Sequence, residues 1–226
     1  ITNPLFLKNL VNSITLLRSQ GLPVMQLQKA TKNLELNLKG RFHTLYMKEW
    51  ILIDDTYNAN PSSFQSVLEN MHNLYPNNRK IVVCGKMAEL GQKSHELHQQ
   101  VGINMVKNGV EILLGLGGKE IESYIGGWKK GGGILKSAKQ FNEIDDLLND
   151  FRNEQKPGDV VLVKGSRSAR MERFIENKYG SVANALSETL FYRTKEIKAS
   201  ATDDTYTAGD VILKAGIEVP SNFIYE

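Results

Sequence analysis

Two acids and a run of polar turn residues follow an apolar segment at residues 50–53. That segment, Trp-Ile-Leu-Ile, predicts a buried strand, and Asp54 and Asp55 come at its carboxyl end. Residues 56–63 read Thr-Tyr-Asn-Ala-Asn-Pro-Ser-Ser and predict a turn followed by a helix cap. Ligands of open α/β sheets bind just outside such strand ends. An isolated acid would more often only cap a turn, but the two acids, the Tyr and the two Asn together predict a polar binding site.

Three further turns combine glycine with a cation where a predicted strand passes into a helix. They are residues 84–91 (Cys-Gly-Lys-Met-Ala-Glu-Leu-Gly), 115–119 (Gly-Leu-Gly-Gly-Lys) and 164–168 (Lys-Gly-Ser-Arg-Ser). Backbone amides and cations at such turns suit a phosphate or a carboxylate, although a single turn of this kind is more often only structural. Neither the P-loop pattern nor the dinucleotide-binding pattern of glycines occurs in the chain.

The histidines and the cysteine do not form a recognisable catalytic or metal-binding pattern. His95 and His98 flank Glu96, but their spacing is not that of a zinc protease and no third ligand is evident. We therefore expect both on a solvated helix face. No Ser, His and Asp arrangement is legible, and Cys84 has no obvious base partner. The sequence thus predicts no metal site and no catalytic residue.

Composition excludes several classes of partner. The 226 residues carry a formal net charge of +3 with dispersed cations, which is not the footprint of a nucleic-acid-binding protein. No apolar run approaches the roughly 20 residues of a membrane span. The single cysteine cannot form an intramolecular disulfide and favours a reducing compartment, so we expect a cytoplasmic protein. Because the chain starts at Ile1 without a Met and passes directly into a helical pattern with no capped beginning, we expect it to be part of a longer polypeptide.

The order of predicted elements is that of an α/β protein. Helices are expected at residues 5–20 and 24–33, a domain boundary near Gly40, and a β-hairpin from segments 42–48 and 49–54. Strands and helices then alternate, which indicates a mostly parallel sheet. The strands are expected at 50–54, 80–84, 111–114, 134–135 and 160–163, and the helices at 63–75, 94–108, 118–125, 141–154 and from about 169. The last fifty residues break this alternation, with a helix expected at 182–192 and a strand at 211–214.

Three of these motifs resemble the Mur ligases in order and spacing. They are Asp-Asp-Thr-Tyr-Asn-Ala-Asn-Pro at 54–61, Gly-x-Met-Ala-Glu-Leu-Gly at 85–91, and Val-Lys-Gly-Ser-Arg-Ser-x-x-Met-Glu at 163–172. The resemblance implies that residues 40–176 form the family's C-terminal domain, with a Rossmann-like, mostly parallel sheet. It also implies that residues 1–39 are the last helices of the central ATP-binding domain. Residues 177–226 resemble nothing in these ligases.

The resemblance also implies which residues bind substrates. Asn9 and Asn12 match the residues that contact the adenine and ribose side of ATP, Arg41 matches the one that reaches its phosphates, and Asp55 the acid that meets the ribose hydroxyls. A pocket for an incoming dipeptide would be lined by Tyr57, Asn58, Asn60, Lys164, Ser166, Arg167 and Ser168.

The implied chemistry is ATP-dependent amide formation through an acyl phosphate, with Mg²⁺ beside the transferring phosphoryl group. The Tyr-Asn-Ala-Asn-Pro form favours the branch that joins D-alanyl-D-alanine to UDP-N-acetylmuramoyl-tripeptide, and we expect a monomer. The family's P-loop and magnesium-binding acid belong to a segment that this sequence lacks. By itself the chain is therefore expected to be inactive.

Two departures and two other interpretations accompany this resemblance. Lys86 stands where the family usually has an acid, and Lys8 where it usually has His. A truncated or divergent copy could be a non-catalytic ligand-binding module of the same fold. Residues 203–210 (Asp-Asp-Thr-Tyr-Thr-Ala-Gly-Asp) resemble the anion-hole motif of ribokinase-like sugar kinases, but too few residues follow to complete that fold.

Overall fold

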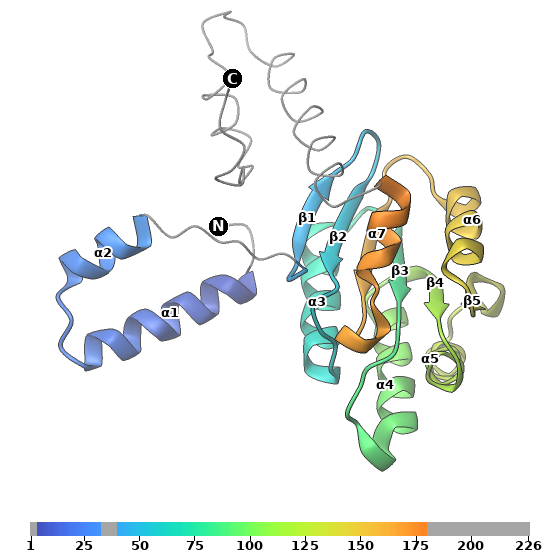
Figure 1. The fold of residues 1–226 in the computed structure, drawn as a ribbon, viewed down its shortest axis with the longest axis horizontal. Coiled ribbons are helices and arrows are strands. Elements are labelled where there is room, and N and C mark those ends of the chain that lie inside the picture. The colour runs from blue at the N-terminus through green and yellow to red at the C-terminus, as the bar shows by residue number, and fades with distance from the viewer. Residues whose placement is uncertain (1–3, 33–39, 180–226) are drawn as a thin grey trace, which may run out of the picture. The chain divides into compact units, whose positions relative to one another are not determined.

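The computed structural model describes residues 4–32 and 40–179, which fall into two compact units (Figure 1). The first unit contains helices α1 (Pro4–Ser19) and α2 (Val24–Lys32). Gly21 adopts a φ of 89° between them, a conformation that glycine reaches without steric cost. Both predicted helices are confirmed to within about a residue.

The second unit is built on a six-stranded sheet with the order β1-β2-β6-β3-β4-β5. Strands β1 (His43–Tyr46) and β2 (Ile51–Asp55) form the predicted antiparallel hairpin. The other pairings are parallel, and they join β2 to β6, β6 to β3, β3 to β4 and β4 to β5. The remaining strands are β3 (Lys80–Cys84), β4 (Val110–Leu116), β5 (Ala138–Phe141) and β6 (Val160–Lys164). The predicted α/β class with a mostly parallel sheet is confirmed.

Helices cover both faces of the sheet (Figure 1). On one face lie α3 (Pro61–Leu74), α4 (Ser94–Lys107) and α5 (Lys119–Lys130). On the other lie α6 (Ile144–Glu154) and α7 (Glu172–Tyr179). The central strands β3 and β6 are buried at every position, because apolar side chains must fill both interfaces of such a sheet. This explains why both strands are apolar except for one terminal lysine each, Lys80 and Lys164.

Helices α4 and α5 approach each other at glycines. A Cβ at Gly102 would lie 2.1 Å from the carbonyl oxygen of Tyr124, and one at Gly127 would lie 1.9 Å from that of Gln99. The sequence predicted that the helix at 118–125 ends at residue 125. This prediction is wrong, because α5 runs to Lys130. Gly126 and Gly127 lower helix propensity, but the close contact between the helices outweighs it.

Three other predicted elements are corrected by the structure. Residues 135–137 form a short 3₁₀ helix, and the strand expected at 134–135 is instead β5. The helix expected from residue 141 begins at Ile144, after the end of β5. A 3₁₀ turn, Arg167–Ala169, occupies the place where a helix was expected, and Arg170 leaves it with a left-handed φ of 50° before α7 starts.

Some predictions concern residues that the structure does not describe. The helix expected at 182–192, the strand at 211–214 and the motif at 203–210 lie outside the described residues. Within residues 4–32 and 40–179, no helix combines the length and the apolar character that crossing a membrane requires.

Candidate functional site

The carboxyl ends of the neighbouring strands β2 and β6 bring Asp55 and Lys164 together. The two residues are directly paired in the parallel register, so their side chains lie on the same side of the sheet. Lys164 Nζ lies 2.5 Å from Asp55 Oδ2 and donates to the carbonyl oxygen of Asn58 at 2.9 Å. The Lys164 side chain is only 1% exposed and that of Asp55 15%. Burial lowers the pKa of Lys164, and the adjacent Asp55 carboxylate opposes this change.

Residues 40–42 form a clip across the turn that follows β2. The Phe42 amide donates to Asp55 Oδ1 at 2.9 Å, and the Gly40 carbonyl accepts from the Tyr57 amide at 2.9 Å. Gly40 and Phe42 both have positive φ, 71° and 51°, which is strained for the phenylalanine. Between them, Arg41 places its guanidinium 4.2 Å from the ring centroid of Tyr57. The clip therefore sets the position of Asp55, Tyr57 and Arg41 together.

Gly40→Ala is expected to destabilise the chain by about 1 to 2 kcal/mol. An alanine would keep the unfavourable positive φ, and its Cβ would lie 2.9 Å from the Tyr57 nitrogen. Chemical denaturation of the variant should show a lower midpoint. Gly132→Ala is a matched control, since Gly132 has a φ of 88° but nothing within 4 Å of the added Cβ. Equal losses in the two variants would show that the contact with the Tyr57 backbone adds nothing.

Asp54 and Asp55 have different roles although they are adjacent. Asp54 is buried, and its Oδ1 accepts from the Thr56 amide at 3.1 Å and from the Thr56 hydroxyl at 2.7 Å. Burial raises the pKa of Asp54, while the two hydrogen bonds from Thr56 oppose that rise. Asp54 therefore shapes the turn, and the acid at the edge of the site is Asp55.

The same turn also starts helix α3. Asn60 Oδ1 accepts from the Ser63 amide at 2.8 Å, and Ser63 Oγ accepts from the Asn60 amide at 3.0 Å, which completes a capping box. Asn58 Oδ1 accepts from the Ala59 amide at 2.8 Å. These local bonds hold the polar residues of the turn in one conformation.

A hollow of about 610 Å³ opens where three motifs meet. It is lined by residues of the turn after β2, of the loop after β3 and of the turn after β6, namely Tyr57, Asn58, Ala59, Asn60, Ala88, Glu89, Leu90, Ser166, Arg167 and Ser168. The last two segments continue the sheet pairing beyond the strands. The Gly85 amide donates to the Lys164 carbonyl and the Ser166 amide to the Lys86 carbonyl, both at 2.9 Å.

The turn after β6 contributes an available cation. Arg167 is 72% exposed, and its nearest carboxylate, that of Glu172, is 3.6 Å away. Ser166 Oγ and Ser168 Oγ lie 3.1 Å apart and share a hydrogen bond. Hydroxyls beside an exposed guanidinium suit a carboxylate or a phosphate group.

Apart from Lys164, the residues predicted for the dipeptide pocket line this hollow, whereas the predicted ATP-binding residues Arg41 and Asp55 are not among its lining residues. Lys164 does not line the hollow, because it is buried beneath the turn and bonded to Asp55. Asn9 and Asn12 are exposed on α1, in the other unit, and are not lining residues of the hollow. Lys86 is exposed and is not a lining residue either.

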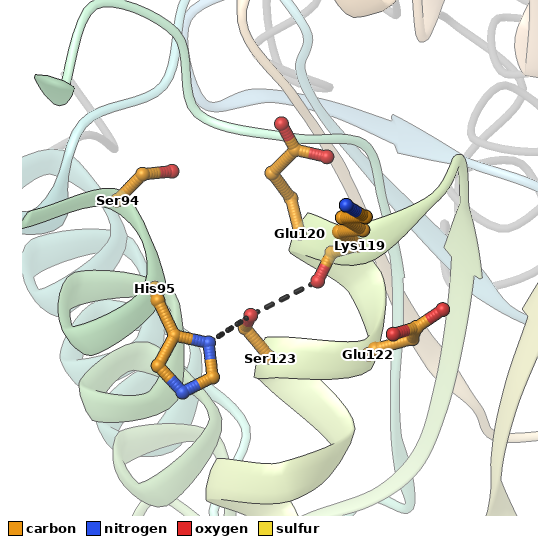
Figure 2. A pocket seen from close by; sticks show the side chains of 6 residues that line it. All are labelled: Ser94, His95, Lys119, Glu120, Glu122 and Ser123. Atoms are coloured by element: carbon orange, nitrogen blue, oxygen red, sulfur yellow. Dashed lines mark hydrogen bonds between the residues drawn. The ribbon is translucent and has the colours of Figure 1, made fainter. Parts of the chain in front are cut away.

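A second hollow of about 360 Å³ lies between the starts of α4 and α5 (Figure 2). It is lined by Ser94, His95, Lys119, Glu120, Glu122 and Ser123. Figure 2 shows Ser123 Oγ between His95 Nδ1, at 2.8 Å, and the Lys119 carbonyl oxygen, at 2.9 Å. In the described part of the chain, no group of three or more His, Cys, Asp and Glu residues could hold a metal ion.

The expectation of a solvated helix face is right for His95 and wrong for His98. His95 is exposed, whereas His98 is fully buried. A sequence signal for this burial existed, because His98, Val101, Gly102 and Met105 share one face of α4 at intervals of three and four residues.

Comparison with known proteins identifies the fold family. The family described as "Mur ligase, glutamate ligase domain" matches residues 40–167, which contain the first two motifs of the hollow and the start of the third. The chain belongs to the Mur ligase family. The resemblance expected from the sequence is thereby confirmed.

Curated members of the Mur ligase family share moderate identity with this chain. The UDP-N-acetylmuramoyl-tripeptide–D-alanyl-D-alanine ligase of Buchnera aphidicola is 38% identical over 130 residues, which are 56% of this chain and 26% of that protein. The ligase of the same name from Mycobacterium bovis is 34% identical over 151 residues, 60% of this chain and 28% of that protein.

The solved structure of a MurF ligase from Thermotoga maritima in complex with ADP gives a TM-score of 0.57 at 29% identity, covering 73% of this chain and 35% of that one. The chain thus spans about a quarter to a third of the length of these relatives.

Proposed function

We propose that this chain is the C-terminal part of an ATP-dependent ligase that joins D-alanyl-D-alanine to UDP-N-acetylmuramoyl-tripeptide in peptidoglycan synthesis. The observation that carries the proposal is the hollow at the carboxyl ends of β2, β3 and β6, because the three family motifs line it. The names of the curated relatives support the choice of substrates. Residues 1–39 would end the central ATP-binding domain, residues 40–176 would form the C-terminal domain, and residues 177–226 would extend it.

The nucleotide would bind at the rim of this hollow that carries Arg41 and Asp55. Arg41 is exposed and has no ion pair with another residue that the structure describes, so it could reach phosphate oxygens. Each oxygen of Asp55 already has one partner, but a carboxylate has about four acceptor positions and could still meet ribose hydroxyls. Asn9 and Asn12 of α1 would contact the adenine side. The solved MurF ligase structure in complex with ADP supports nucleotide binding in the family.

The dipeptide would enter the hollow itself. Arg167 with Ser166 and Ser168 would bind its carboxylate, and Tyr57, Asn58 and Asn60 would form the opposite wall. We assign Lys164 a different role from the one implied by resemblance. From its buried position it would hold Asp55 and the Asn58 carbonyl in place, and so act on both binding regions.

The reaction would transfer the terminal phosphoryl group of ATP to the carboxylate of the tripeptide. The amine of D-alanyl-D-alanine would then attack the acyl phosphate, forming the amide and releasing phosphate. Mg²⁺ would neutralise charge on the transferring group, but we assign no magnesium ligand to this chain, given its lack of a metal cluster in the described residues. We propose that the intact enzyme is a monomer and works in the cytoplasm.

The test uses the intact protein that carries this chain, incubated with ATP, UDP-N-acetylmuramoyl-tripeptide and D-alanyl-D-alanine. We expect one phosphate released for each dipeptide joined, and release that depends on all three substrates. The 226-residue chain alone should release none. An intact protein that binds D-alanyl-D-alanine in calorimetry but releases no phosphate would instead support the non-catalytic ligand-binding module.

A further inference from the structure

His98 lies outside the hollow, but both of its ring nitrogens are engaged. The Met87 amide donates to His98 Nε2 at 3.0 Å, and His98 Nδ1 lies 2.6 Å from the Ser94 carbonyl oxygen. A carbonyl can only accept, so Nδ1 carries the hydrogen and Nε2 is the acceptor. The side chain is 0% exposed, and burial lowers its pKa. The geometry therefore requires a neutral imidazole of one tautomer.

The imidazole is fixed by the helix that crosses α4. The ring centroids of His98 and Tyr124 are 4.7 Å apart in an edge-to-face arrangement. The Tyr124 hydroxyl in turn donates to the Gly85 carbonyl at 3.5 Å. Two side chains, one from α4 and one from α5, thus hold the beginning of the loop at residues 85–91.

This loop forms one wall of the hollow and needs external support. Its Ala88, Glu89 and Leu90 line the hollow, and Glu89 adopts a strained φ of 62°. Where the loop faces β6, it is fixed by two backbone hydrogen bonds, from the Gly85 amide to the Lys164 carbonyl and from the Ser166 amide to the Lys86 carbonyl. On the side of α4 the buried Met87 amide is satisfied by His98. Without that acceptor a buried amide would be left unpaired, which favours a rearranged loop.

We propose that His98 is a positioning residue that fixes the loop at residues 85–91 in the conformation that binds the dipeptide. The inference rests on the proposed function, because it assigns that wall of the hollow to D-alanyl-D-alanine. His98 does not touch the substrate, and it acts through the Met87 amide. The residues that form the rim for ATP, Arg41 and Asp55, are not in contact with it.

The experiment compares three variants of the intact protein. His98→Phe keeps a ring against Tyr124 but removes the acceptor. His98→Gln restores it, since a glutamine amide oxygen can take the place of Nε2. His95→Phe is the matched control on the same helix, at an exposed residue of the second hollow (Figure 2). The readouts are the KM for D-alanyl-D-alanine, the KM for ATP, kcat and hydrogen exchange of the Met87 amide.

His98→Phe is expected to raise the KM for the dipeptide about tenfold and to speed Met87 exchange, with the KM for ATP unchanged. His98→Gln should restore both values and His95→Phe should alter neither. Because burial lowers the pKa of His98, its imidazole should stay neutral through the ordinary histidine range around pH 6.5. Only below that range should the wild-type KM for the dipeptide rise more than that of His98→Gln, because a protonated imidazole cannot accept from Met87. The other ionisable groups around the imidazole, Glu120, Tyr124 and His95, are the same in both proteins.

The outcomes separate this inference from the proposed function. One outcome would overturn the positioning role alone. In it the wild-type ligase is active and His98→Phe speeds exchange of the Met87 amide, but the KM for the dipeptide does not change. Equal increases in the KM for ATP and for the dipeptide would also overturn it, since they indicate general loss of structure. If His98→Phe does not fold, His98→Gln decides the question. A KM for the dipeptide in His98→Gln that differs from the wild-type value would then overturn the inference. Absence of ligase activity in the wild-type protein would overturn the proposed function instead.

Discussion

Lys164→Met is expected to lower the free energy of unfolding by about 3 to 5 kcal/mol, because it removes one partner of a buried ion pair. The methionine would fill much the same volume, so packing is largely kept. What is lost is the cation that pairs with Asp55 and donates to the Asn58 carbonyl. Both groups would remain in a poorly solvated place without that donor. Urea denaturation of the 226-residue chain, followed by circular dichroism, measures the effect.

A double variant tests whether the loss comes from the unpaired acid. In Asp55→Asn with Lys164→Met, the amide oxygen can still accept from Phe42, but no charge is left behind. We expect this double variant to recover at least half of the stability lost in Lys164→Met. A double variant that is less stable than Lys164→Met would contradict the assignment of the loss to an uncompensated charge, and would point to packing around Phe64, whose ring lies 5.3 Å from Lys164 Nζ.

Gly127→Ala is expected to destabilise the chain by about 3 kcal/mol, although alanine is the better helix former. The added Cβ would lie 1.9 Å from the carbonyl oxygen of Gln99, and backbone cannot move aside as a flexible side chain can. Helices α4 and α5 would have to separate, which also disturbs the contact between His98 and Tyr124. The midpoint of thermal or urea unfolding should fall accordingly.

Gly126→Ala is the control next to it in the same helix. Its Cβ would meet only the end of the Gln99 side chain, at 3.4 Å, so the gain in helix propensity should remain. We expect Gly126→Ala to be neutral or to stabilise by up to about 1 kcal/mol. Opposite signs at adjacent glycines identify the helix crossing as the cause. Similar losses in both variants would show that a glycine is needed here for some other reason.

Much of the fold could be predicted from the sequence because its signals are local. The sequence predicted the apolar runs that became β3 and β6, a helix cap within residues 56–63, and the hairpin that leads to Asp55. The helix itself begins at Pro61, two residues before its predicted start. Element boundaries were less certain where a local signal competed with packing. The helix predicted at 118–125 stops just before Gly126 and Gly127, whereas the contact with α4 carries α5 on to Lys130.

The sequence predicted which residues belong to the candidate site better than it predicted what each of them does. The motifs of the β2, β3 and β6 ends do line one hollow, as the parallel order of strands requires. The burial of Lys164, however, depends on Asp55, which lies 109 positions earlier in the chain. The difference between Asp54 and Asp55 depends on which side of the strand each faces. The burial of His98 could have been predicted from its spacing to Val101 and Met105, but its hydrogen-bond partner, the Met87 amide, could not, because backbone amides leave no signal in residue types.

The sequence by itself determined the α/β class, the family and the strand ends where the chemistry would take place, since periodicity and short motifs are properties of neighbouring residues. Only the tertiary structure decided which polar groups face the hollow and which support it from within. Hydrogen-bond partners and burial are set by segments far apart in the chain, as between Asp55 and Lys164 or His98 and Met87. For that reason the ion pair below the site and the imidazole behind the loop became visible only in the folded chain.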